Sequence, residues 1–167
     1  MRALKAPVLL VSLLFLLLGP GVSVGKEKLR WLGFNEGIAE AQKTGKKVLI
    51  DVYTDWCVWC KRMEASTYSN DGVASYLARH YVLIRLNAES ASRVQYKGTS
   101  YSEQDLARAF GVTGYPTTIF LKPNGEPITG MPGYAEAGRF MDVIAFIGED
   151  HYLKQKFDEY VAGKSKK

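Results

Sequence analysis

Two short apolar runs, Val48–Tyr53 and Tyr81–Asn87, have the length and composition of β-strands that are buried on both faces. The segment between them has helical spacing of apolar residues, with a break at residues 69–72. Two strands that are joined through a helix lie parallel in one sheet, with a right-handed crossover. The sequence therefore predicts an α/β fold.

The remaining segments extend this pattern in both directions. Asn35 is expected to cap a helix that ends at Gly45, and Ser102 to Asp105 has the form of a capping box that opens another helix. Residues 88–101 are polar and indicate a loop. A strand at 117–121, a turn and a returning strand at 127–129 predict an antiparallel pair. The expected architecture is a mixed central β-sheet flanked by helices on both faces.

The C-terminal part of the chain is expected to be helical. Phe140, Val143, Ile144 and Ile147 share one helical face, and Leu153 to Val161 continue the pattern after a break at Gly148. The chain has 167 residues, a length that suits a single domain.

The two cysteines, Cys57 and Cys60, lie three positions apart where the first predicted strand gives way to a helix. Unpaired N–H groups at a helix N-terminus stabilise an anion, so the pKa of the Cys57 thiol is expected to be low. Cys60 lies one turn further along and is expected to be more buried. These features favour a redox pair in which Cys57 attacks a disulfide and Cys60 resolves the mixed disulfide.

Two other readings of the cysteine pair are weaker. A disulfide that closes so short a loop removes only about 2 kcal/mol of unfolded-state entropy, so a purely structural staple is disfavoured. A closed zinc site needs four ligands, and neither His80 nor His151 has ligand spacing. No metal site is therefore predicted, although copper(I), which accepts two thiolates, stays open.

Charged residues interrupt both of the apolar strands. Asp51 lies between Ile50 and Val52, six residues before Cys57. A buried carboxyl group has a raised pKa, so Asp51 is expected to exchange a proton with Cys60 during resolution. Arg85 either pairs with Asp51 or extends to the rim of the sheet.

Aromatic residues flank the cysteines. Trp59 is expected to offer an exposed docking surface for substrate, and Trp56 to pack over the site. Pro116 follows Gly114 and Tyr115, and its peptide bond is either an ordinary trans bond at a strand start or a cis bond. A cis bond would present the Tyr115 backbone for β-type pairing with a substrate peptide.

The N-terminus has the order of a secretory signal. Arg2 and Lys5 precede an apolar run at 6–18, and small residues follow up to Gly25. The run is shorter than the roughly 20 residues that span a bilayer. We expect a signal peptide at 1–25 and a mature domain at 26–167, with an uncleaved anchor or a mitochondrial-type presequence as the alternatives. Export would place the cysteines where a disulfide persists.

The charge of the chain argues against nucleic-acid binding. Lys and Arg total 22 and Asp and Glu total 17, so the net charge is +5, and the lysines near the C-terminus form a short solvated tail. No nicotinamide or flavin motif is present, so no cofactor is expected. Since the chain has no such cofactor, we expect a membrane thiol donor to return electrons to the cysteine pair. We also expect the chain to be a monomer.

Taken together, these motifs resemble the thioredoxin superfamily. The similar pieces are Asp51, the 56–61 segment WCVWCK, the 114–117 segment GYPT, the 124–126 turn and Gly133, in the order of the family. The resemblance covers about residues 31–148. It implies a thioredoxin fold, Cys57 as nucleophile, Cys60 as resolving cysteine, Asp51 as proton-transfer group and Pro116 as a cis-proline.

Within the superfamily, the chain is similar to exported bacterial members such as the DsbD C-terminal domain and SoxW-type thioredoxins. Val58 and Trp59 replace the Gly-Pro pair of ordinary thioredoxin, so the motif leaves reductase, isomerase and oxidase open. The absence of an inserted helical domain favours a reductase that acts on periplasmic protein disulfides. Residues 26–167 would then form a thioredoxin-like domain with an extra C-terminal helix. The alternatives are a copper(I)-binding protein and a client-binding module.

Overall fold

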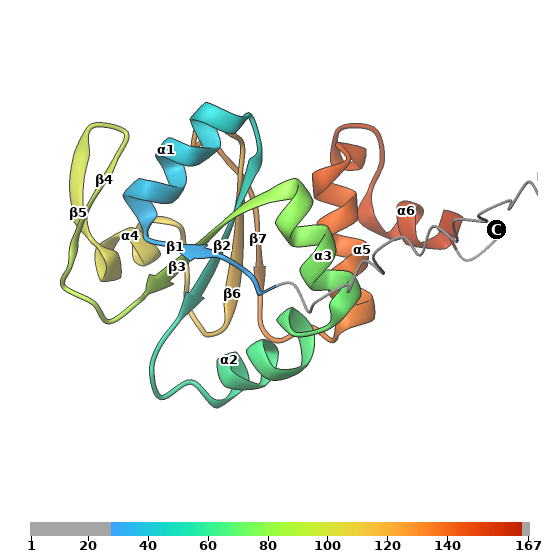
Figure 1. The fold of residues 1–167 in the computed structure, drawn as a ribbon, viewed down its shortest axis with the longest axis horizontal. Coiled ribbons are helices and arrows are strands. Elements are labelled where there is room, and N and C mark those ends of the chain that lie inside the picture. The colour runs from blue at the N-terminus through green and yellow to red at the C-terminus, as the bar shows by residue number, and fades with distance from the viewer. Residues whose placement is uncertain (1–27, 165–167) are drawn as a thin grey trace, which may run out of the picture.

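A computed structural model describes residues 28–164, and the predicted signal peptide lies outside these residues. Five strands form the central sheet in the order β1-β3-β2-β6-β7 (Figure 1). The strands are β1 (Trp31–Leu32), β2 (Lys47–Tyr53), β3 (Tyr81–Asn87), β6 (Thr117–Leu121) and β7 (Pro127–Pro132). β1, β3 and β2 are parallel, whereas β6 and β7 run antiparallel to their neighbours. The predicted mixed sheet is confirmed.

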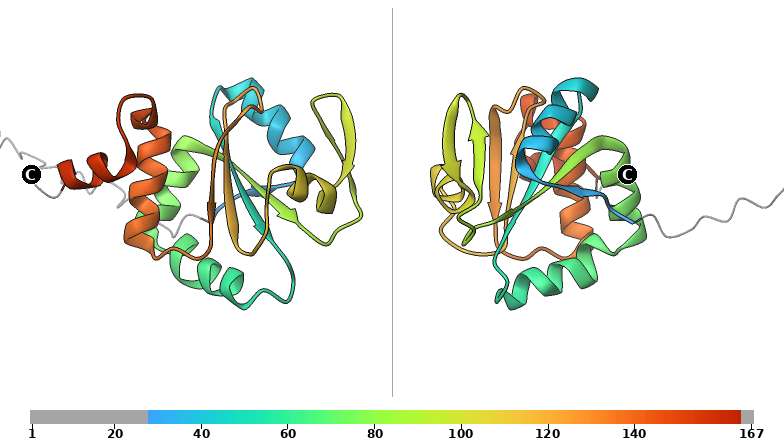
Figure 2. Two further views of the ribbon diagram at one scale, coloured as in Figure 1. Left: turned by 180° about the vertical axis from the view of Figure 1, so that it is seen from behind. Right: turned by 60° about the vertical axis from the view of Figure 1, so that its left-hand side comes forward.

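Helices cover both faces of the sheet (Figure 2). One face carries α1 (Phe34–Thr44) and α4 (Glu103–Ala109). The other carries α2 (Val58–Met63), a π-helical turn η1 (Glu64–Tyr68), α3 (Asp71–His80) and α5 (Ala137–Gly148). The alternation of β2 divides the core: Val48, Ile50 and Val52 face the first layer, and Leu49 faces the second. Asp51 therefore points toward α2 and η1.

Most of the predicted boundaries are confirmed. Gly45 ends α1 with a positive φ of 70°. The break at 69–72 is the start of α3, where the Asn70 side chain accepts from the N–H groups of Gly72 and Val73. Ser102 caps α4 by accepting from the Asp105 N–H.

The predicted cap at Asn35 is wrong. The cap lies two residues earlier, at an extended Gly33 that has no side-chain cap, and helix α1 begins at Phe34. The Asn35 side chain instead accepts a hydrogen bond of 2.9 Å from the Gln95 N–H. That contact attaches the N-terminal end of α1 to the segment around residue 95.

The predicted loop at 88–101 is also wrong, because it contains a β-hairpin. Strands β4 (Arg93–Tyr96) and β5 (Thr99–Ser102) pair antiparallel around Lys97 and Gly98, which both have positive φ. Val94 and Tyr96 join the core beneath α1 and α4, and the Tyr96 ring meets the edge of Phe34 at 5.8 Å. The alternation of apolar residues in this segment is short, and its mostly polar composition therefore hid the hairpin.

The chain continues beyond α5 through a 3-10 turn, η2 (His151–Leu153), to α6 (Phe157–Lys164). Aromatic contacts of Phe146 with Phe157 and Tyr160 hold α6 against α5. Between residues 28 and 164, no helix has both the length and the apolar character required to cross a membrane.

Replacing Gly37 with alanine is expected to destabilise the protein by about 1–3 kcal/mol, because the new Cβ would overlap the Ile84 side chain on β3. Gly138 in α5 provides the matched control, since a Cβ there meets nothing within 4 Å. Urea unfolding of both variants measures the difference. Equal stabilities of the two variants would show that α1 does not pack as closely on β3 as described.

Candidate functional site

Cys57 and Cys60 lie at the start of α2 and are joined by a disulfide bond. Cys57 is the N-cap residue of the helix, and its Sγ accepts the backbone N–H of Cys60 at 3.0 Å. The helix continues into η1, so a run of aligned peptide groups begins at this sulfur. The predicted position of Cys57 at a strand-to-helix junction is confirmed.

The relative burial of the two cysteines differs from the prediction. Cys57 is only 3% exposed, whereas Cys60 is half-buried. The reason is that the Cys57 side chain turns inward to the helix start, while Cys60 faces an open cavity. That cavity has a volume of about 180 Å³ and is lined by Cys60 together with Asp51, Tyr53, Thr54, Asp55, Lys61, Glu64 and Arg85.

Asp51 lies at the floor of this cavity, near the middle of β2, and is only 4% exposed. Burial raises the pKa of Asp51 to about 6, although Arg85 and the Tyr68 hydroxyl oppose the shift. The predicted burial and raised pKa are confirmed. A carboxyl group with this pKa changes its protonation near neutral pH, as a group that exchanges protons with a thiol must.

Arg85 does both of the things that its position suggested. It is the neighbour of Asp51 in the β2–β3 register, and its Nε lies 3.6 Å from Asp51 Oδ2. Its Nη2 extends to the rim and lies 2.9 Å from Glu64 Oε1. The guanidinium also lies over the Trp31 ring, at 4.9 Å from its centroid. Arg85 thus links the buried carboxylate to an exposed one on η1.

Both tryptophans next to the cysteines are exposed, Trp56 by 63% and Trp59 by 56%. Trp56 meets the edge of Tyr115 at 6.0 Å and its indole N–H donates to Glu89 at 2.9 Å, and its packing over the site stays a prediction. Trp59 rests on Tyr134 at 5.4 Å and is exposed as predicted.

The Tyr115–Pro116 peptide bond is cis. It precedes β6, where Thr117 pairs with Val52 of β2. The fold therefore brings β6, which follows this bond, beside the part of β2 that leads to the cysteines.

Sequence reasoning missed three residues around Asp51. Glu64 and Tyr68 come from η1, and the Tyr68 hydroxyl lies 3.4 Å from Asp51 Oδ1. Thr118 is fully buried opposite Asp51 in the β2–β6 register. Helical spacing alone does not place Tyr68 here, because the π turn departs from a period of 3.6 residues.

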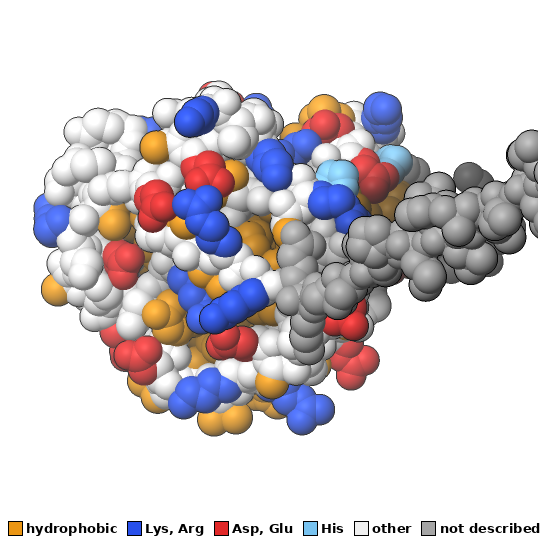
Figure 3. Space-filling model, viewed as in Figure 1, with side chains coloured by type: hydrophobic (Ala, Val, Ile, Leu, Met, Phe, Trp, Pro, Cys, Tyr) orange, Lys and Arg blue, Asp and Glu red, His pale blue; other side chains and the backbone are white. Residues whose placement is uncertain are grey.

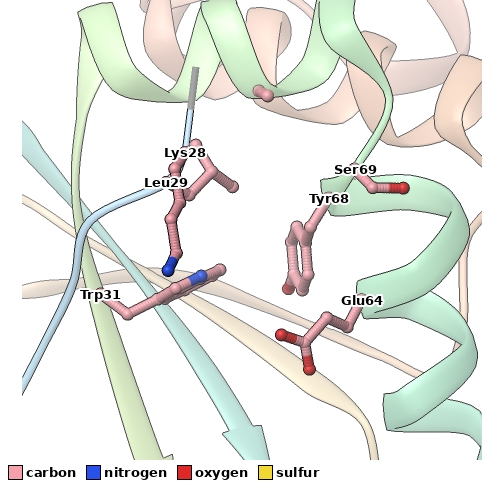
Figure 4. Close-up of a pocket in the computed structure, with 7 residues that line it drawn as sticks. Lys28, Leu29, Trp31, Glu64, Tyr68 and Ser69 are labelled. Carbon is pink, nitrogen blue, oxygen red and sulfur yellow. The ribbon is translucent and has the colours of Figure 1, made fainter. Parts of the chain in front are cut away.

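A second cavity of about 300 Å³ is also lined by Glu64 and lies between the start of the described chain and α3. Leu29, Trp31, Tyr68 and Ala74 give it apolar walls, with Lys28 and Glu64 at its rim (Figure 4). This face of the molecule shows apolar side chains bordered by basic and acidic ones (Figure 3). No cluster of three or more potential metal ligands occurs within residues 28–164.

This arrangement defines a class: proteins with a thioredoxin fold in which the first cysteine of a CxxC motif caps the helix that follows the central strand. A family model described as a thioredoxin-like domain matches residues 34–148, and the chain belongs to this family.

Comparisons with individual proteins agree with this assignment. Over 114 residues the chain is 32% identical to the thiol:disulfide interchange protein DsbD of Actinobacillus pleuropneumoniae, an alignment that covers 64% of this chain. It spans only 18% of that DsbD. A thioredoxin from Thermus thermophilus is 25% identical with a TM-score of 0.59, over 71% of this chain and 86% of that one. A thioredoxin-fold protein from Helicobacter pylori has a TM-score of 0.60 at 22% identity, over 80% and 94%.

Proposed function

We propose that this protein is an exported thiol–disulfide oxidoreductase that reduces protein disulfides through Cys57 and Cys60. The observation that carries the proposal is the placement of the two sulfurs. One caps a helix and accepts a backbone N–H, and the other faces a cavity with a buried carboxyl group at its floor. The first position suits a nucleophilic thiolate, and the second suits a thiol that needs a base.

The reaction proceeds in two exchanges. The Cys57 thiolate attacks one sulfur of the substrate disulfide, a Cys57–substrate disulfide forms, and the other substrate sulfur leaves as a thiolate. Cys60 then gives its proton to Asp51 and attacks Cys57 Sγ, which releases the second substrate thiolate. The enzyme ends with the Cys57–Cys60 disulfide seen in the structure, and the substrate gains two electrons.

An exposed apolar surface beside the cysteines supports a protein substrate. Trp56, Val58 and Trp59 are each more than half exposed, although large apolar side chains seldom remain in solvent together. The neighbouring Tyr115 and Tyr134 extend the surface through their contacts with the two tryptophans. A substrate peptide with apolar residues near its cystine would fit here.

Export and the reducing direction belong to the proposal. The signal-like segment at 1–25 supports export to the periplasm. The similarity to proteins named thiol:disulfide interchange proteins supports a second thiol protein, in the membrane, as the donor of the electrons that regenerate the cysteine pair. Within residues 28–164 the structure adds a hairpin and α6 to the fold but no inserted helical domain, which supports a reductase. Equilibration with glutathione tests the direction, because a strongly oxidising couple would contradict it.

A trapping experiment tests the proposed function. A disulfide peptide with a different fluorophore on each half is mixed with reduced protein. Cys60→Ser is expected to release one half and to retain the other covalently on Cys57, whereas wild type releases both. Retention on Cys60 in a Cys57→Ser variant, with none in Cys60→Ser, would reverse the assigned roles. Failure of wild type to release either half would contradict the function itself.

A further inference from the structure

Tyr68 is one of the site residues that the reaction described above leaves without a role, and it is the one whose side chain is hydrogen-bonded to Asp51. Its side chain is buried, and its ring is held edge-on by Trp31 at 5.1 Å and by Phe140 at 5.5 Å. These two contacts come from β1 and α5, two elements that lie far from the π turn in the sequence. The ring is therefore held in one place, and its hydroxyl stays at the Asp51 carboxyl group.

The hydroxyl and Arg85 together hold the two oxygens of Asp51. Tyr68 Oη lies 3.4 Å from Oδ1, and Arg85 Nε lies 3.6 Å from Oδ2. Only the Tyr68 contact is a hydrogen bond and therefore directional, because Arg85 Nε has no hydrogen-bond partner among the described residues. Arg85 is shared with Glu64 and its side chain is 30% exposed, so the fixed member of the pair is Tyr68.

We propose that Tyr68 is a positioning residue: its hydroxyl orients the Asp51 carboxyl group and stabilises its charged form for proton exchange with Cys60. The inference rests on the proposed function, since it assigns Tyr68 a part in the resolving step. The π turn supports it, because such turns occur frequently at functional sites and this one carries both Glu64 and Tyr68.

The hydroxyl is suited to this role because it keeps its proton. Burial raises the pKa of Tyr68 well above its ordinary value, with the Asp51 charge adding to the effect. Tyr68 therefore donates to the carboxylate over the whole working range and does not compete as a base. The other charged or titratable groups near Asp51 are Cys60 on α2, Arg85 on β3, Glu64 on η1, and Tyr53, Asp55 and Lys61 around the cavity.

The test is Tyr68→Phe, which keeps the ring and removes only the hydroxyl. With the two-fluorophore peptide, release of the first half reports attack by Cys57, and release of the second half reports resolution by Cys60. The second release is expected to slow about two- to twelvefold at pH 7, the size of one hydrogen bond. Its pH midpoint is expected to rise by up to about one pH unit, because a donor to the charged carboxyl has been lost.

Two controls separate positioning from a structural effect. Tyr81→Phe removes another buried hydroxyl, which donates to the Ile144 carbonyl at 2.7 Å, and it is expected to leave the pH midpoint unchanged. In an Asp51→Asn background, Tyr68→Phe is expected to have no further effect on the second release. An unchanged pH midpoint in Tyr68→Phe, or an equal slowing in the Asp51→Asn background, would overturn the proposal.

A measurement on the unmutated protein covers the case in which Tyr68→Phe does not fold. In protein labelled with ¹³C at the tyrosine Cζ, the Tyr68 signal is expected to shift as Asp51 titrates, and the shift is expected to vanish in Asp51→Asn. A Tyr68 signal that ignores the Asp51 titration contradicts the inference. Absence of peptide reduction by wild type is a different result, because it contradicts the function and leaves this titration intact.

Discussion

Replacing Cys57 with serine is expected to lower the rate of disulfide reduction by at least about a thousandfold. A serine hydroxyl is not ionised at neutral pH and cannot form a disulfide with either the substrate or Cys60. The N-cap position does not compensate, because a hydroxyl there accepts the Cys60 N–H without becoming a nucleophile toward sulfur. Reduction of the fluorescent disulfide peptide by pre-reduced protein measures the loss.

Ser66→Ala is the matched control for this substitution. Ser66 lies on η1 and bonds to Tyr134 and to the Arg62 carbonyl, outside the cysteine pair. It is expected to reduce the peptide at close to the wild-type rate. If Cys57→Ser retained a tenth or more of the wild-type activity, Cys57 would not be the attacking sulfur.

The strands at the centre of the sheet could be predicted because their surroundings determine their composition. Three strands, β2, β3 and β6, are covered on both faces. Each therefore appears in the sequence as a largely apolar run that contains few polar residues. The exceptions carried the most information. A carboxylate inside such a run implies burial, and Asp51 is indeed buried beside the cysteines.

Other elements could not be predicted because local patterns did not identify them. β1 has two residues, which is too short to show a period of two. The β4–β5 hairpin is mostly polar, and only the Lys97–Gly98 pair signals its turn. Asn35 resembles a cap, but its side chain bonds to the hairpin instead.

The candidate site shows the same division between local and tertiary information. The helix start locates Cys57 from sequence alone. Glu64 and Tyr68 reach Asp51 only because a π turn changes the direction of the side chains that follow Cys60. The larger exposure of Cys60 depends on a cavity whose walls come from α2, η1, β2 and β3, which no local pattern predicts.

Asp51→Asn is expected to make the protein more stable at pH 8 while it slows resolution. Burial raises the pKa of Asp51 from 3.8 to about 6, so the folded state binds the proton more tightly than the unfolded state. The stabilisation that this provides is complete below pH 4 and is lost as the pH rises through 6. Above that pH the buried charge costs about 3 kcal/mol, of which asparagine should recover about 1–3 kcal/mol.

The same substitution removes the base that accepts the Cys60 proton. Release of the second half of the peptide is expected to slow about a hundredfold at pH 7, and the difference from wild type should shrink above pH 9, where the thiol ionises unaided. Asp158→Asn, on the exposed side of α6, is the control and should change neither property.

Urea unfolding at pH 4 and pH 8 measures the stabilities, and an equal gain at both pH values would show that Asp51 carries no buried charge. Stability and activity are thus expected to change in opposite directions when Asp51 is replaced. The burial that destabilises the charged carboxyl group also raises its pKa, and the raised pKa suits it to accept a proton from a thiol near neutral pH.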